Sequence, residues 1–145
     1  MKWDYTDRRI FQEIQPGVFL GPLASSRACE TLAEHRITTL VAIRTEQTRK
    51  IFKERYPEQF RYEYIDIVEG SLLSVLPRIT PFIQGCLGRG ERLLFYDETG
   101  NAKGAVVVCA YLMETLGIDS ATAYSMVKNK RLSVTLSEHE RYQLQ

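Results

Sequence analysis

The sequence has few of the residues that build disulfide-stabilised or zinc-stabilised domains. Its 145 residues include only two histidines and three cysteines, Cys29, Cys86 and Cys109, at wide and irregular spacing. Neither a Cys-x-x-Cys pair nor a Cys/His cluster is present, so we expect no disulfide framework, no metal site and no cofactor. Because such thiols persist in reducing compartments, we expect the protein in the cytoplasm, the nucleus or both.

Long hydrophobic runs and an excess of one charge are also missing. The longest apolar run, Ala105 to Met113, has nine residues, which is roughly half of what a membrane-spanning helix needs. Nineteen Lys and Arg residues oppose eighteen Asp and Glu residues, for a net charge of +1. This balance gives no reason to expect nucleic acid or a membrane surface as partner. The length suits one domain, residues 1–145, with an ordinary hydrophobic core.

Short apolar segments alternate with helical patterns along the chain. We predict strands over 18–20, 38–43, 60–67 and 92–96, and helices over 25–35, 48–55, 72–87, 104–116 and 119–130, with a last one from Ser137. This alternation predicts an α/β fold with a central, mostly parallel sheet flanked by helices. Ligands of such sheets bind at the carboxyl ends of the strands, so the loop after Tyr96 is the candidate site.

Capping residues support several of these helices. Gly117 is expected to end one helix, Asp119 to begin the next, and Ser137 to open a capping box with Glu140. Two prolines interrupt the predicted helix over 72–87, so we expect a kink there, or a second start with Thr80 as the cap. The last-turn cations Lys128, Lys130 and Arg131 suit the negative end of a helix.

The candidate loop combines a buried strand, a glycine and a helix start, an arrangement that binds phosphate through backbone N–H groups. Its residues are Tyr96, Asp97, Glu98, Thr99, Gly100, Asn101, Ala102, Lys103 and Gly104. Two unit charges about 4 Å apart interact by about 4 kcal/mol at an effective dielectric constant of 20. A phosphate dianion facing ionised Asp97 would therefore lose about 8 kcal/mol, so we expect the cradle to hold no phosphate.

These residues resemble the active-site loop of the dual-specificity phosphatase family, which reads His-Cys, five residues, then Arg-Ser or Arg-Thr. Tyr96-Asp97 stands at the His-Cys position and Lys103-Gly104 at the Arg-Ser position, with five residues between them. The apolar helix after the loop is similar to the family's, and residues 8–22 resemble the start of an inactive member. The resemblance covers the chain from about Trp3 to Val127 and implies a phosphatase-like fold.

Each departure from the family's pattern removes a catalytic part. The resemblance implies a nucleophilic cysteine thiolate, which is replaced by Asp97, and a phosphate-binding arginine, which is replaced by Lys103. Glu69 stands near the family's general-acid position, and Gly100 keeps its family identity. We therefore expect no catalytic residues and a pseudophosphatase that binds other proteins in signalling, with kinase-pathway or ubiquitin-ligase components as partners. The oligomeric state stays open.

Three alternatives remain for the loop itself. In the first, Asp97 accepts the loop N–H groups and pairs with Lys103, taking the place of the missing oxyanion. In the second, Lys103 and the loop amides still bind phosphoproteins weakly, without hydrolysis. In the third, Asp97 is the nucleophile of a magnesium-dependent phosphatase, because an apolar strand followed by Asp-x-Thr-Gly is superficially similar to aspartyl-phosphate enzymes.

Overall fold

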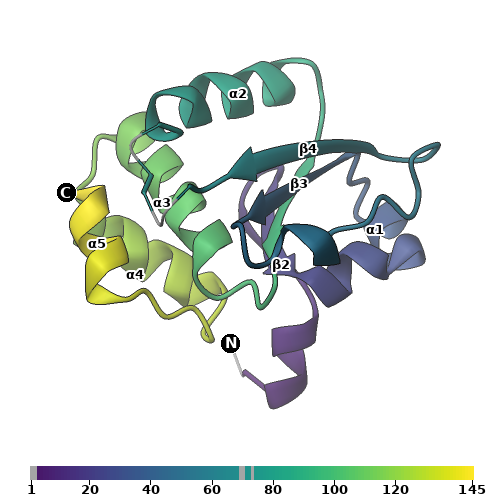
Figure 1. Cartoon of the computed structure of the whole chain (residues 1–145), viewed down its shortest axis with the longest axis horizontal. Helices are drawn as coiled ribbons and strands as arrows, with labels where there is room; N and C mark the ends of the chain where they lie inside the picture. Colours follow the sequence, from purple (N-terminus) through teal and green to yellow (C-terminus); the bar gives the residue numbers. More distant parts are fainter. Residues whose placement is uncertain (1–2, 69–70, 73) are drawn as a thin grey trace.

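A five-stranded sheet forms the centre of the computed structural model, which describes residues 3–68, 71, 72 and 74–145 (Figure 1). Its strands, in chain order, are β1 (Gln12–Gln15), β2 (Val18–Pro22), β3 (Thr39–Arg44), β4 (Arg61–Asp66) and β5 (Leu93–Asp97). They lie in the order β1-β2-β5-β3-β4, and only the β1–β2 pair is antiparallel. The predicted mostly parallel sheet is confirmed. β1 was not predicted, because it is short and mostly polar.

Helices cover both faces of this sheet (Figure 1). One face packs against α1 (Cys29–Glu34), and the other against α2 (Leu76–Gly88), α3 (Lys103–Leu116), α4 (Ser120–Lys130) and α5 (Glu138–Leu144). Side chains alternate along a strand, so Phe19 joins the core on the α1 side while Val18 and Leu20 join the core on the opposite side. The apolar β5 is buried throughout, as expected of a strand covered on both faces.

The predicted capping residues are confirmed at three helix ends. Gly117 ends α3 in the left-handed conformation, with φ 66°. The Asp119 carboxylate accepts a hydrogen bond from the Thr122 N–H at 2.8 Å at the start of α4. Ser137 and Glu140 form the reciprocal capping box of α5. Within the described ranges, none of these helices has the length and hydropathy to cross a membrane.

Two predicted helices differ from the structure near the α1 side. The segment predicted as a helix over 25–35 is a 3₁₀ turn (Leu23–Arg27) followed by the short α1. Neither of the expected capping residues, Ser25 or Ser26, caps a helix there, because their hydroxyls donate back to the Pro22 and Leu23 carbonyls at 2.7 and 2.6 Å. The predicted helix over 48–55 is wrong, since only Arg49–Ile51 form a 3₁₀ turn. This charged segment lacks the apolar stripe that packing of a longer helix requires.

α2 begins later than predicted and runs through its second proline. It starts at Leu76 with Pro77 in the first turn, where the missing N–H costs no helical bond. Pro81 and Thr80 both lie inside the helix, so the predicted restart with Thr80 as cap is wrong. Ile79 and Ile83 are buried in the core, and this packing offsets the bond that Pro81 cannot make.

Candidate functional site

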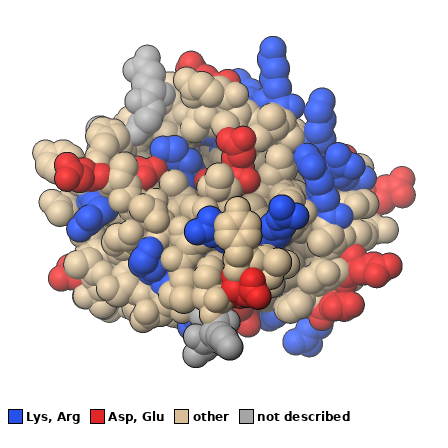
Figure 2. Space-filling model, turned by 90° about the horizontal axis from the view of Figure 1, so that it is seen from below, with Lys and Arg blue, Asp and Glu red and all other residues tan. Residues whose placement is uncertain are grey.

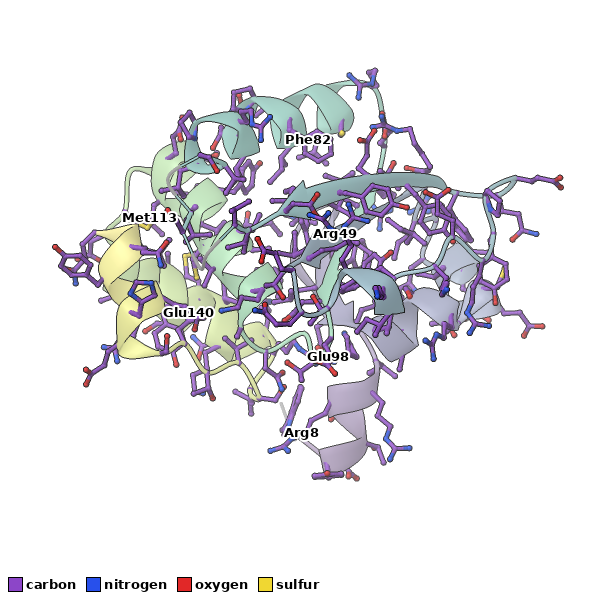
Figure 3. All side chains as sticks on the ribbon, in the orientation of Figure 1. Arg8, Arg49, Phe82, Glu98, Met113 and Glu140 are labelled. Atoms are coloured by element: carbon purple, nitrogen blue, oxygen red, sulfur yellow. The ribbon has the colours of Figure 1, made fainter. Side chains whose placement is uncertain are left out.

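The loop predicted to carry the chemistry connects β5 to α3 at the carboxyl edge of the sheet (Figure 3). We call residues 96–104 the β5–α3 loop. Tyr96 is buried on the α1 side of the sheet, where burial raises the pKa of its hydroxyl. Glu98 and Thr99 are exposed, and the Glu98 carbonyl accepts a hydrogen bond from the Leu23 N–H at 3.3 Å. The loop is thus anchored to the end of β2.

Asp97, at the position where the family resemblance places a nucleophile, is buried. Asp97 is only 5% exposed, and its Oδ2 accepts a hydrogen bond from the Lys103 backbone N–H at 3.2 Å. Burial raises the pKa of this carboxyl to about 6, although the amides of Lys103, Gly100 and Gly104 and the charge of Arg131 act in the opposite direction. The carboxylate thus accepts the first backbone N–H of α3, which is one part of what the first alternative predicts.

One oxygen of this carboxylate has no partner among the described residues. Asp97 Oδ1 is buried and accepts no hydrogen bond. A Cβ added to Gly104 would lie 3.4 Å from that oxygen and 2.8 Å from Leu20 Cδ1, so the surroundings are tight and partly apolar. A buried acceptor without a donor is costly, and it is costlier when charged. This environment accounts for the raised pKa.

Lys103 does not pair with Asp97. Its Nζ donates to Glu140 Oε2 at 2.8 Å, so the predicted Asp97–Lys103 ion pair is wrong. Glu140 is almost buried and is also the capping-box residue of α5. Burial opposes its ionisation, but the hydrogen bonds from Lys103 and Ser137 outweigh that effect and lower the pKa of Glu140. The only cationic side chain of the β5–α3 loop is therefore directed to the last helix.

Arg131 holds the carbonyl side of the loop, a role that its place in the sequence does not indicate. The residue is completely buried, and its Nε and Nη2 donate to the carbonyls of Gly100 and Thr99 at 2.8 and 2.9 Å. The same guanidinium donates to the carbonyls of Arg8 and Ile10 at 2.9 and 2.8 Å. Burial lowers the pKa of Arg131 to about 10. Arg131 does stand at the end of α4, as its C-cap residue, but its guanidinium is buried against the loop.

Arg131 thus ties the N-terminal segment to the loop. Its Nη1 also reaches the Gln12 Oε1 at 2.7 Å and the Asp7 carbonyl at 3.4 Å. A planar, five-donor guanidinium can satisfy this many acceptors, whereas an ammonium group cannot. No pattern in the sequence marks it, because a charged residue at a helix end is normally solvated.

The remaining loop residues pack against neighbouring backbone. Gly100 has φ +73°, and a Cβ there would lie 2.4 Å from the carbonyl carbon of Gly21. The Asn101 side-chain oxygen accepts a hydrogen bond from the Ser133 hydroxyl at 2.6 Å. The backbone carbonyl of Asn101 accepts a hydrogen bond from the Thr135 N–H at 2.9 Å. These contacts explain why glycine stands at position 100, and they hold the loop against the segment between α4 and α5.

The chemistry available at this site is limited. The nearest cysteine along α3, Cys109, is buried, and burial raises the pKa of its thiol to about 12. In the part of the chain that the structure describes, no three His, Cys, Asp or Glu side chains lie together as potential metal ligands. Glu69, the predicted counterpart of the general acid, lies outside the described residues. The β5–α3 loop therefore contains a buried carboxylate with one orphaned oxygen, and it contains no cysteine.

Comparisons with known proteins agree with the predicted fold class. A family model described as "Dual specificity phosphatase, catalytic domain" matches residues 18–145. The serine/threonine/tyrosine-interacting protein of Homo sapiens is 32% identical over 149 aligned positions, covering 99% of this chain and 67% of that protein. The crystal structure of the human tyrosine phosphatase-like serine/threonine/tyrosine-interacting protein superposes with a TM-score of 0.87 at 32% identity, over 94% of each chain. Human DUSP28 superposes with a TM-score of 0.80 at 25% identity, over 92% of this chain and 89% of that one.

Proposed function

The chain belongs to the dual-specificity phosphatase family, and from this premise we propose that it is a pseudophosphatase, a member without phosphatase activity that binds other proteins. The observation that carries the proposal is the position of Asp97. Its carboxylate accepts the first amide of α3, in the cradle where the resemblance places the substrate phosphate. A site that already holds a negative group of its own has little affinity for a second one.

The loss of the nucleophile supports the same conclusion. Phosphoryl transfer to a protein residue needs a nucleophile that can reach the phosphorus, and a charge that balances the phosphate. Asp97 is 5% exposed, and the Lys103 ammonium is paired with Glu140. An aspartyl-phosphate mechanism would also need magnesium, and no cluster of three potential ligands accompanies Asp97 among the residues described.

Protein partners are proposed on two grounds. The name of the human relative describes an interacting protein, and the family resemblance points to kinase-pathway or ubiquitin-ligase components. Figure 2 shows Lys and Arg side chains interspersed with Asp and Glu side chains on the lower face of the molecule, with basic ones gathered at its upper right. Together with a net charge of +1, this mixture suits a protein surface better than a polyanion. We propose the cytoplasm and nucleus as locations.

The decisive experiment measures hydrolysis and anion binding together. We expect no vanadate-sensitive hydrolysis of an aryl phosphate at any pH tested, and no heat of binding with tungstate at neutral pH. Removing the internal anion in Asp97→Ser should open the cradle, so this variant serves as the positive control for tungstate binding. Turnover by the unmodified protein, or tungstate bound next to Asp97, would overturn the proposal.

Two further titrations distinguish the alternatives. Calorimetry with phosphorylated and unmodified versions of one peptide should give equal or absent affinity, and a preference for the phosphorylated form would identify a phosphoprotein-binding module. Beryllium fluoride with magnesium should leave the thermal stability unchanged, and magnesium-dependent protection that is lost in Asp97→Asn would identify an aspartyl nucleophile.

A further inference from the structure

A groove separates the edge strand β4 from α2, on the side of the molecule away from α1 (Figure 3). Its volume is about 270 Å³, and its lining comprises Glu63, Tyr64 and Ile65 of β4 together with Val75, Arg78, Ile79 and Phe82. Figure 3 places Phe82 between α2 and β4. The volume is below the roughly 300–1,000 Å³ of most small-molecule sites and suits an inserted side chain.

The outer edge of β4 offers unpaired backbone groups beside this groove. The N–H groups of Arg61 and Ile67 donate toward β3, to Thr38 and Arg44. Because residues alternate along a strand, the N–H and C=O groups of Tyr62 and Tyr64 point away from β3. β4 is the last strand of the sheet, and no described residue bonds to these outward groups. Such an edge can accept an additional strand.

The groove is lined by two charged side chains, Glu63 and Arg78, and they differ in whether they are already paired. Arg78 is exposed and has no ion pair or hydrogen bond with any residue that the structure describes. The other charged lining residue, Glu63, is already paired with Arg61. A ligand that brings a carboxylate to Arg78 would therefore gain a charge-assisted contact, whereas a basic ligand would be repelled.

We propose that this groove binds an extended segment of a partner protein that pairs with the edge of β4. The segment places an apolar side chain against Ile65 and Phe82 and a carboxylate beside Arg78. Main-chain hydrogen bonds to Tyr62 and Tyr64 supply affinity. The groove contacts every second side chain of the segment and so supplies specificity, as in other cases of strand addition. The inference rests on the proposed protein-binding function and assigns it a surface away from the β5–α3 loop.

The test begins with a phage library of random linear peptides selected on the whole chain. Enriched peptides should combine alternating apolar residues with an acidic one. A synthetic copy should bind about tenfold more weakly to Arg78→Glu, because attraction becomes repulsion. Arg27→Glu, which reverses an exposed charge elsewhere, should leave the affinity unchanged. Replacing the acidic residue of the peptide with lysine should restore binding to Arg78→Glu.

Amide exchange measured by NMR supplies the second readout. In the free protein, the outward amides of Tyr62 and Tyr64 should exchange rapidly, and the bound peptide should protect them. The inward amides, already bonded to β3, should change little. No enrichment, affinity indifferent to Arg78→Glu, or protection confined to other elements would overturn the groove assignment.

Failure of this inference is distinguishable from failure of the proposed function. If Arg78→Glu still captured the same partner proteins as the unmodified chain, the protein-binding function would stand and the groove assignment would fall. Phosphatase turnover would overturn the proposed function and leave the peptide measurements unaffected.

Discussion

Asp97→Asn should stabilise the protein at neutral pH, because the native carboxylate is held in an unfavourable environment. Burial raises its pKa to about 6 from an ordinary value of 3.8. At 1.36 kcal/mol per pH unit, this difference corresponds to about 3 kcal/mol of lost stability once the group is ionised in both states. Asparagine keeps an acceptor for the Lys103 N–H but carries no charge.

Because the pKa of Asp97 is raised in the folded protein, the contribution of this carboxyl to stability falls as the pH rises. The native state binds the Asp97 proton more tightly than the unfolded chain does, so the favourable contribution is complete below about pH 3.8. It is lost as the pH rises through about 6. The difference in unfolding free energy between Asp97→Asn and the unmodified protein should therefore be largest above pH 7 and shrink by about 3 kcal/mol as the pH falls below 3.8.

Urea denaturation of both proteins at a series of pH values measures this difference. Other titrating groups, including Glu140, contribute equally to both proteins and cancel. Asp66→Asn provides a control of opposite sign, since the hydrogen bond from Arg44 lowers the pKa of Asp66 and its removal should destabilise at neutral pH. A free-energy difference for Asp97→Asn that is independent of pH, or a loss of stability at pH 7, would refute the reasoning.

The remaining predictions concern the partners of the loop and are measured by urea denaturation. Arg131→Met should cost about 4 kcal/mol, because it leaves buried carbonyls without donors, whereas Lys130→Met, at an exposed neighbour, should change stability little. Gly100→Ala should cost about 4 kcal/mol from combined strain and backbone overlap, while Gly90→Ala, with similar positive φ and open space, should cost only about 1 kcal/mol. Glu140→Gln keeps the capping box but removes the ion pair with Lys103, so it should lower the unfolding free energy by about 1 kcal/mol at pH 7. This loss should vanish in acid, where the Glu140 carboxylate of the unmodified protein is protonated.

The strands and capped helices were predictable because they depend on local signals. Apolar runs located β3 and β5, and Gly117, Asp119 and Ser137 marked helix ends that the structure reproduces. The predicted helix over 48–55 was wrong because helix propensity does not stabilise a helix that has no apolar face to pack on the core.

The site was predictable only in part. A strand, a loop with glycine and a helix start placed Asp97 at the amides of α3, because that geometry is local. The partner of Lys103 was not predictable, since Glu140 lies 37 residues away and reaches the loop only through the packing of α5 on α3. Arg131 was missed for the same reason.

The protein itself supplies a partner on each side of the β5–α3 loop. Asp97 faces the amide of Lys103, and the guanidinium of Arg131 takes the carbonyls of Thr99 and Gly100. A phosphate loop that awaits substrate must keep its amides available, and it gains stability when the anion binds. In this chain the amide cradle contains a covalently attached carboxylate, so its occupancy does not depend on ligand concentration. The loop can therefore keep its folded shape without a bound anion.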